Sequence, residues 1–534
     1  SCSDVLDLNP ADRFSPATVW STTTTADKYV IGLYSIFGAN TEMRGGDAYA
    51  SPRLSDAYSD ILKSTSWNQY NHNFNATLLQ ETAFNSNSAG AFECWSSHYD
   101  RIRRENEFLR DAAEFGRKFG EDWLKIRIAE VRFCRAYAYF MLCRVYGGGI
   151  LRTEVDGPEQ NDKARSTEEE GWGFIINELK ELAPDLPLKW DSDNSGRATQ
   201  KAAYGLLSRV ALYAEKWDVA AQAARDCATA EGNLDLSKNG YAKIFELGIN
   251  SPEVLFAVEF KSSVIDHAYD AYVRPSGDTK ELGKQVYSGF VPTSELVDSY
   301  EMAGDGGNFS WEKHGKDPYA NREPRFYATI LYNGADWMGR KIESFVGGKD
   351  GYKAYENAGA AGTTVTGYYL RKYLIDGDKT WVTSGSGQDW IVLRYAEVLL
   401  NKAEALAMEN WNKNSAEALQ ALNDVRARVG LPARATADKE TFLEYVRHER
   451  KVELAGEGFR YWDLRRWRLA EKVIDGQNVH GVKISKQSDG SFTYEQVDAD
   501  GGHKRIFYDR YYRFAILLSE RSNNSLCTNN DGWI

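Results

Sequence analysis

The stretch 206-LLSRVALYAEKWDVAAQAARDCA-228 contains two helical patterns separated by a short break. Small and bulky residues recur at helical spacing at Leu207, Ser208, Ala211, Trp217, Ala220, Ala224 and Cys227. This order is typical of a tetratricopeptide repeat, in which small side chains let two helices approach and an aromatic side chain fits between them. The stretch therefore predicts a packed helix pair.

The same pattern returns in 394-RYAEVLLNKAEALAMENWNKNSAEALQALNDVRARVG-430. Before the first pair, 124-LKIRIAEVRFCRAYAYFMLCRVYGG-148 places apolar residues about 3.6 positions apart, and a further helix is expected from residue 166. Together these units predict a helical scaffold over residues 92–230 and 388–430 of a single-domain, mainly α protein. We expect Trp95, Trp217, Trp462 and Trp467 to pack in its core, and Cys134 and Cys143 to be buried free thiols.

Residues 232–387 have a different composition, rich in Gly, Asp, Asn, Tyr and Trp. Within them, 252-PEVLFAVEF-260 is a short apolar run that predicts a strand. Long irregular segments in compact proteins are usually functional or disordered, and disorder would leave many aromatic side chains in water. We therefore expect large ordered loops and a few short strands.

Composition excludes several classes of function. The chain has 534 residues and a formal net charge of −12, which disfavours a nucleic-acid partner. No apolar run is long enough to span a bilayer as a helix. The six cysteines and seven histidines do not follow the spacing of a zinc site, and no phosphate-binding loop, dinucleotide fingerprint or hydrolase nucleophile elbow is present.

Two acidic features need a decision between alternatives. The loop beginning at Asp191 lacks the final glutamate of a calcium-binding EF-hand, because Ala202 stands there, although a calcium site built from separate loop carboxylates stays open. The segment 447–467 could provide the carboxylate pair of a glycoside hydrolase. Its acids lie among arginines, which keep carboxylates ionised, so we expect a structural ion-pair network formed by Glu449, Glu453, Glu457 and Asp463.

The stretch 449-ERKVELAGEGFRYWDLRRW-467 resembles the hallmark of the SusD/RagB family, the surface glycan-binding lipoproteins of Bacteroidetes. Further similar stretches run along nearly the whole chain, namely 1–10, 95–109, 129–148, 196–213, 251–260 and 512–534. The chain departs from the family pattern at 516-ILL-518, where Pro-Ile-Pro is usual, and at 144-RVYGGGILR-152, which lacks the usual aspartate and proline.

The resemblance implies a SusD-like fold that binds oligosaccharide or polysaccharide without cleaving it and without a cofactor. It implies that Cys2 is acylated and anchors the protein to the cell outer membrane, with residues 1–25 as a tether and the family motifs in residues 440–534. It also implies a partner, a TonB-dependent outer-membrane transporter of the SusC type. A free cysteine in a frayed terminus is the alternative for Cys2.

A sugar ring stacks its C–H face on an exposed indole or phenol ring, while amide, carboxylate or guanidinium groups bind its hydroxyls. Residues 232–387 are therefore expected to form the ligand-binding portion, together with the loop that follows residue 65. The predicted ligand contacts are Trp67, Asn68, Tyr70, Asn71, Tyr272, Arg274, Trp311 and Trp337. Each aromatic residue has an alternative role, which is to clamp its loop onto the scaffold.

Three other functions stay open at this point. A glycoside hydrolase would need a carboxylate pair. A purely protein-binding scaffold of tetratricopeptide type would need no ligand-binding loops. A peptide-binding, RagB-like protein would use the same fold for another nutrient.

Overall fold

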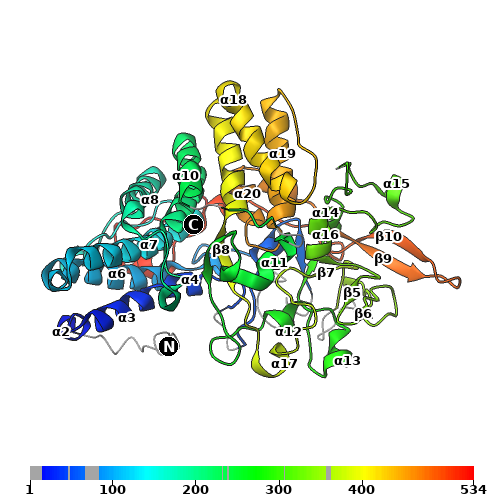
Figure 1. The fold of residues 1–534 in the computed structure, drawn as a ribbon, viewed down its shortest axis with the longest axis horizontal. Coiled ribbons are helices and arrows are strands. Elements are labelled where there is room, and N and C mark those ends of the chain that lie inside the picture. The colour runs from blue at the N-terminus through cyan, green and yellow to red at the C-terminus, as the bar shows by residue number, and fades with distance from the viewer. Residues whose placement is uncertain are drawn as a thin grey trace.

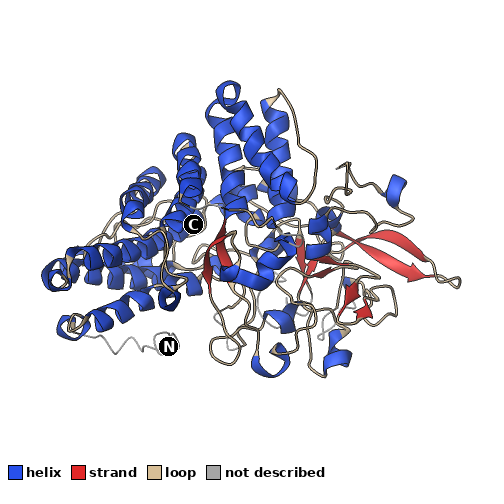
Figure 2. Ribbon diagram, viewed as in Figure 1, coloured by secondary structure: helices blue, strands red, loops and turns tan. Residues whose placement is uncertain are grey.

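The computed structural model describes residues 15–45, 49–65, 83–230, 233–236, 240–305, 307–355 and 363–534. The predicted mainly helical fold is confirmed. Long helices form one end and the top of the molecule, and short strands and loops form the other end (Figures 1 and 2). None of the helices in these ranges is long and apolar enough to cross a membrane.

The helical scaffold contains the predicted pair, because α9 and α10 pack side by side and both contact α18. Gly205 permits this arrangement: a Cβ atom there would lie 3.0 Å from Leu255 and 3.5 Å from Val398. A larger residue would push α9 away from the strand and helix behind it. The helices within 92–230 are α6 (Trp95–Phe115), α7 (Glu121–Tyr146), α8 (Glu168–Leu182), α9 (Gln200–Tyr213) and α10 (Trp217–Thr229).

The second helical unit is α18 (Tyr395–Arg428), which is two helices joined at the non-helical residue Asn410. α19 (Lys439–Leu454) lies beside it, and the two stand at the top of Figure 1 next to α10. Trp95 and Trp462 are buried, and Trp217 and Trp467 are half-buried against the same core, as expected. Cys134 and Cys143 are buried free thiols, as predicted.

The N-terminal segment corrects one expectation. Residues 1–25 were predicted to be a tether, yet the chain is folded from Ser15 onward in α2 (Pro16–Val19), α3 (Thr23–Leu33) and α4 (Ser35–Ala39). The reason is Trp20, which is 1% exposed and packs 4.7 Å from Phe108 of α6, measured between ring centroids. Cys2 and the rest of residues 1–14 lie outside the described residues.

Strands in the described residues form two-stranded antiparallel sheets. The strand predicted in 252–260 is confirmed as β2 (Val254–Val258), which pairs with β8 (Trp390–Arg394). A longer hairpin near the C-terminus was not predicted; it projects from the loop-rich end in Figure 1. The other pairs are β1 (Leu62–Ser64) with β3 (Phe290–Pro292), β4 (Ile330–Leu331) with β7 (Tyr369–Leu370), β5 (Asp336–Trp337) with β6 (Arg340–Lys341), and the hairpin itself, β9 (His480–Lys486) with β10 (Phe492–Asp498).

The loop-rich portion and the C-terminal region also contain short helices. One continuous hydrophobic core includes residues from the helical scaffold, these helices and the sheets, so the two ends are packed together. The short helices are α11 (Gly240–Leu247), α12 (Tyr269–Val273), α13 (Asp278–Leu282), α14 (Ser294–Val297), α15 (Trp311–His314), α16 (Pro324–Thr329), α17 (Trp381–Ser384), α20 (Arg460–Arg466), α21 (Ala470–Ile474) and α22 (Leu518–Asn523).

Candidate functional site

The acidic cluster of residues 449–463 is an internal ion-pair network, as the arginines around it suggested. Glu453 is fully buried and contacts Arg325 at 3.0 Å, Arg394 at 2.6 Å and Arg428. Burial by itself would raise the pKa of Glu453, but these guanidinium groups outweigh it and hold the pKa well below its usual value. A carboxylate held ionised in this way cannot serve as a general acid.

The other members of the cluster are equally enclosed. Glu457 is 4% exposed and binds Arg394 at 2.7 Å, and Asp463 is 2% exposed and binds Arg450 at 2.7 Å. Glu449 has no exposed surface. The carboxylates of this segment therefore stabilise the interior and do not face a substrate.

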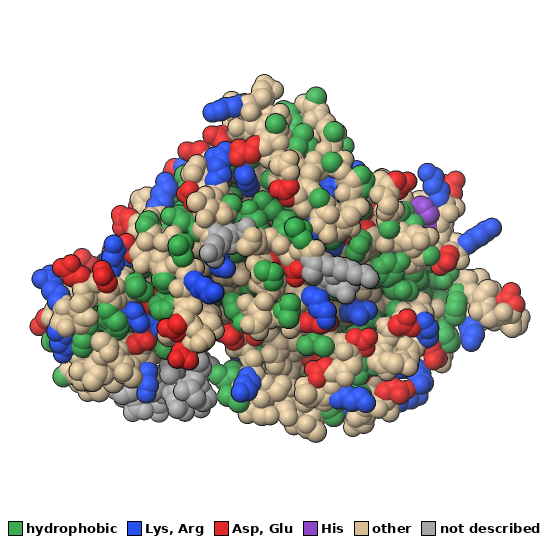
Figure 3. All heavy atoms as spheres, in the orientation of Figure 1, with side chains coloured by type: hydrophobic (Ala, Val, Ile, Leu, Met, Phe, Trp, Pro, Cys, Tyr) green, Lys and Arg blue, Asp and Glu red, His purple; other side chains and the backbone are tan. Residues whose placement is uncertain are grey.

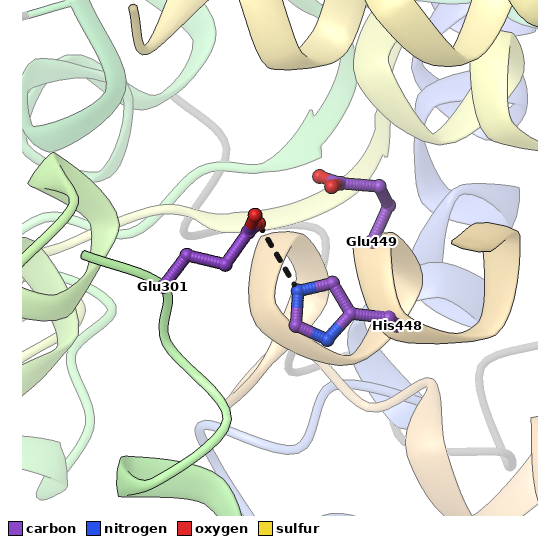
Figure 4. A group of neighbouring side chains, drawn as sticks. All are labelled: Glu301, His448 and Glu449. Atoms are coloured by element: carbon purple, nitrogen blue, oxygen red, sulfur yellow. Dashed lines mark hydrogen bonds and ion pairs between the residues drawn. The ribbon is translucent and has the colours of Figure 1, made fainter. Parts of the chain in front are cut away.

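Glu301, His448 and Glu449 lie close enough together to be tested as a metal site (Figure 4). His448 Nε2 lies 3.3 Å from Glu301, but the guanidinium group of Arg426 contacts Glu301 at 2.8 Å and also contacts Glu449. Arg426 thus supplies the positive charge that these two buried carboxylates need. Among the described residues, this is the group in which three potential metal-ligand side chains lie close together. Because Arg426 already pairs with both carboxylates, we interpret it as an ion-pair cluster.

Arg274 and Trp337 were predicted to contact ligand, and the structure corrects both predictions. Neither side chain has exposed surface. Arg274 binds Asp270 at 2.8 Å and Asp278 at 3.1 Å, and its guanidinium group lies 4.7 Å from the ring of Trp381. The indole N–H of Trp337 donates to the same Asp278 at 3.1 Å. These residues clamp α12 and α13 to β5, which is the alternative role considered for loop aromatics.

The remaining predicted residues are Tyr272, four residues outside the described ranges, and Trp311. Tyr272 is 5% exposed, which leaves little of its ring accessible to a ligand. We therefore no longer propose Tyr272 as a ligand contact. Trp67, Asn68, Tyr70 and Asn71 lie outside the described residues, and their role stays a prediction. The described chain leads toward them at Thr65, whose N–H donates to the carbonyl of Gly289 at 3.0 Å, beside the half-buried Tyr287.

Trp311 is the predicted residue that the structure leaves partly accessible. It begins α15, its side chain is half-buried, and its indole N–H donates a hydrogen bond to Asp298. Its ring lies 5.4 Å from Phe309 and 5.5 Å from Tyr494 of β10. Because the N–H group is already bound and two rings support the indole, the accessible part of the ring is held in one orientation.

Further tyrosines extend this feature into an aromatic surface, which we define as Trp311, Tyr494, Tyr332 and Tyr327. The four half-buried rings lie around the buried Tyr319, whose ring is 5.9 Å from Tyr494 and 5.1 Å from Tyr332. Tyr327 lies 5.8 Å from Tyr332. Hydrophobic side chains gather on the face beside the β9–β10 hairpin in Figure 3.

Sequence reasoning missed the three tyrosines of this surface. Tyr494 stands on a strand whose pairing was not predicted, Tyr327 lies in the short helix α16, and Tyr332 follows β4, which has only two residues. Within the part of the chain that the structure describes, the hydroxyl groups of Tyr494 and Tyr332 have no hydrogen-bond partner. Such rings can offer both a stacking face and a polar group to a sugar.

One small sheet connects the two regions where ligand contacts were predicted. The strand β1 ends next to Gly289, and the described part of the chain stops there at Thr65. The opposite end of the partner strand β3 runs directly into α14 and Asp298, which holds Trp311. The described chain therefore leaves opposite ends of this pair of strands, toward Thr65 at one end and toward Asp298 at the other.

Comparisons with known proteins agree with this architecture. The sequence model of the SusD family matches residues 252–533, and a model described as starch-binding and associating with the outer membrane matches residues 4–212. A SusD-like protein of Bacteroides ovatus is 25% identical over 94% of this chain and 87% of its own length.

Two solved structures share the fold over nearly the whole chain. The crystal structure of a SusD-like protein from Bacteroides fragilis has a TM-score of 0.85 and 26% identity, covering 98% of this chain and 100% of the other. A SusD-like carbohydrate-binding protein from the same species has a TM-score of 0.78 and 23% identity, with coverage of 95% and 99%.

Proposed function

Because the chain belongs to the SusD family, whose members are non-catalytic binding proteins, we propose that it captures a glycan at the outer-membrane surface without cleaving it. The observation that supports this function best is the aromatic surface around Trp311. Its rings are partly accessible and supported from below, which suits the stacking of a sugar ring. The family assignment excludes the glycoside hydrolase alternative.

The loop that carries Trp67, Asn68, Tyr70 and Asn71 would provide a second wall of the binding surface. The described chain leads from β1 to Thr65 and from β3 to Asp298, so both regions are connected to the same small sheet. A binding surface with two such parts would suit a polymer that continues beyond the site. Such a surface would recognise the glycan by ring stacking and by contacts to its hydroxyl groups.

The experiment is affinity electrophoresis of the purified protein through gels that contain different polysaccharides, among them starch and laminarin. We expect at least one glycan to retard the protein, and Trp311→Ala to weaken that binding by about tenfold, since aromatic contacts of this kind contribute on the order of 1 kcal/mol or more. Trp67→Ala tests the part of the surface outside the described residues.

Trp190→Ala is the matched control, because Trp190 is also half-buried and its N–H is also bound, to the carbonyl of Ala198 at 2.7 Å. Its migration should equal that of the wild type. Failure of every glycan to retard the wild-type protein would contradict the proposal, and binding to peptides alone would favour the peptide-binding alternative. Retention of both variants equal to that of the wild type would place the glycan contacts elsewhere on the protein.

The second part of the proposal concerns delivery. We propose that acylated Cys2 anchors the protein and that its stacked helices provide a broad surface for a SusC-type TonB-dependent transporter. Cys2→Ala should move the protein from the membrane fraction to the soluble fraction of its native cells. A tagged protein extracted in detergent should co-purify with a transporter of that class. If the purified sample contained no such transporter, the partnership would be refuted.

A further inference from the structure

A cavity lies in the helical part of the molecule, away from the Trp311 surface. It is a cavity of about 340 Å³ where the end of α7, the start of α8, the α9–α10 turn and α20 meet. In Figure 1, α8 and α15 lie toward opposite ends of the long axis. The charged residues that line this cavity are Arg144, Glu168, Glu169, Glu215, Lys216, Arg465, Arg466, Arg468 and Arg513.

The carboxylates of this cavity are already engaged or turned to solvent. Glu168 binds Arg513 at 2.6 Å, and Glu169 binds Lys216 at 3.2 Å. Glu215 is exposed in the turn between α9 and α10. They therefore leave the positive charge of the other lining residues uncompensated.

Of these, Arg466 is neutralised from outside the cavity, because it contacts Glu404 and Asp463. Arg144, Arg465 and Arg468 are different. Within the described residues, none of them forms an ion pair with a carboxylate, although the protein as a whole is acidic. The cavity is thus a local concentration of positive charge on a chain with a net charge of −12.

Arg465 is the most buried of these three arginines. Its side chain is 3% exposed, and among the described residues its hydrogen bonds go to the backbone carbonyls of Arg144, Tyr511 and Tyr512, at 2.9–3.2 Å. The same residues offer no hydrogen-bond partner to its Nε atom. Burial lowers the pKa of Arg465 to about 9, and the charges of Arg513 and Arg144 act in the same direction.

Arg144 and Arg465 are held in place by one aromatic ring. The guanidinium carbon of Arg144 lies 3.9 Å from the ring of Trp462, and that of Arg465 lies 4.6 Å from it. The Nε atom of Arg144 is buried and also lacks a hydrogen-bond partner within the described ranges of the chain. Two cations fixed close together without a carboxylate in direct contact favour the binding of an anion between them.

We propose that this cavity binds a small oxyanion, a sulfate or phosphate group, between Arg144, Arg465 and Arg468. Guanidinium groups bind such anions with paired N–H donors and remain charged, which is the chemistry that this cavity contains. Arg468 is exposed and provides the contact at the entrance, while Arg144 and Arg465 supply the charge further in. The site is independent of the glycan-binding proposal, since none of its residues belongs to the Trp311 surface.

Isothermal titration calorimetry of the full chain with potassium sulfate, against potassium chloride of equal ionic strength, tests the site. We expect saturable binding of sulfate with one site per chain. Arg144→Gln and Arg468→Gln should each weaken the sulfate affinity by about tenfold, because each removes a charged donor. Arg468 is exposed, so its variant keeps the test valid even if Arg144→Gln disturbs the packing on Trp462.

Arg117→Gln is the matched control, because it removes the same charge from an exposed position before α7 begins. At about 1.5 Å per residue, the 26 residues of α7 separate this position from the cavity by about 39 Å. Its sulfate affinity should equal that of the wild type. Absence of saturable sulfate binding, or equal weakening by all three variants, would overturn the proposal.

The oxyanion has two possible sources, and competition distinguishes them. A sulfated monosaccharide that displaces sulfate, when its unsulfated form does not, would assign the site to a charged substituent of a larger ligand. Displacement by inorganic phosphate but not by the sulfated sugar would assign it to the free ion. Either result supports a site at Arg144 and Arg468 only if Arg144→Gln and Arg468→Gln each also weaken binding of the competing ligand.

Discussion

The indole N–H of Trp311 donates a 3.0 Å hydrogen bond to the carboxylate of Asp298. Asp298 directly follows α14, and α14 follows β3, so a strand of the β1–β3 sheet determines where the carboxylate lies. Trp311 starts a helix of only four residues, which could not orient a large ring by itself. The hydrogen bond therefore fixes the indole of Trp311 relative to the β1–β3 sheet.

The charge of Asp298 predicts a dependence of stability on pH. Burial raises the pKa of Asp298 from 3.8 to about 6, and the Trp311 hydrogen bond only partly opposes this. The folded state thus favours the protonated form, and its stability falls as the pH rises from about 4 to 6. Asp298→Asn keeps an acceptor for Trp311 without the charge. We expect the variant to exceed the wild type by about 1–3 kcal/mol in unfolding free energy at pH 7.5.

Denaturant unfolding at pH 4 and pH 7.5 measures this effect, and the difference should approach zero at pH 4. Asp336→Asn is the control, because the side chain of Asp336 is 83% exposed and its loss should change little at either pH. A gain in stability of the same size at both pH values would argue against burial of the Asp298 charge.

Tyr494 should contribute to glycan binding although the sequence did not indicate it. Its ring lies 5.5 Å from Trp311 and supports the indole from β10. Tyr494→Ala removes both this support and a stacking face, so we expect retention on the bound glycan to weaken by about three- to tenfold. Tyr494→Phe keeps the ring and tests the hydroxyl alone. Equal affinities of the wild type and Tyr494→Ala in the gel assay would remove Tyr494 from the surface.

The buried network around Glu453 should be a major determinant of stability. Glu453→Gln leaves Arg325, Arg394 and Arg428 with less counter-charge in a site without solvent. Breaking such a network typically costs about 3–5 kcal/mol, which would appear as a lower denaturation midpoint. Glu444→Gln is the comparison, because Glu444 is 70% exposed and pairs only at the surface. A change of less than about 1 kcal/mol for Glu453→Gln would refute the role given to the network.

Trp20 tests the corrected boundary of the N-terminal segment. Because the indole packs against Phe108 and Phe119, Trp20→Ala should leave a cavity and lower the unfolding free energy by about 3–5 kcal/mol. Leu188→Ala removes an apolar side chain that is 50% exposed and should have a small effect. If both variants unfolded at the same denaturant concentration, residues 15–25 would behave as the tether that was first expected.

The sequence by itself determined the parts of this protein that depend on local pattern. The 3.6-residue period and small residues of 206–228 were enough to predict the α9–α10 pair, and the apolar run at 252–260 was enough to predict β2. Interspersed opposite charges in 447–467 indicated an ion-pair network, because arginines so close in sequence must affect the carboxylates between them. Motifs similar to those of the SusD/RagB family occur along nearly the whole chain, so the sequence also predicted the overall fold.

The accessibility of the loop aromatics followed from tertiary packing and not from local sequence pattern. Trp311 and Trp337 have similar surroundings in sequence, but Trp337 meets Asp278 in the interior, whereas Trp311 lies at the surface beside Tyr494. Trp20 likewise lies in a polar segment and is buried because α6 brings Phe108 to it. The physical reason is the same in each case: burial of a ring depends on partners distant in the chain, and the composition of a loop does not specify them.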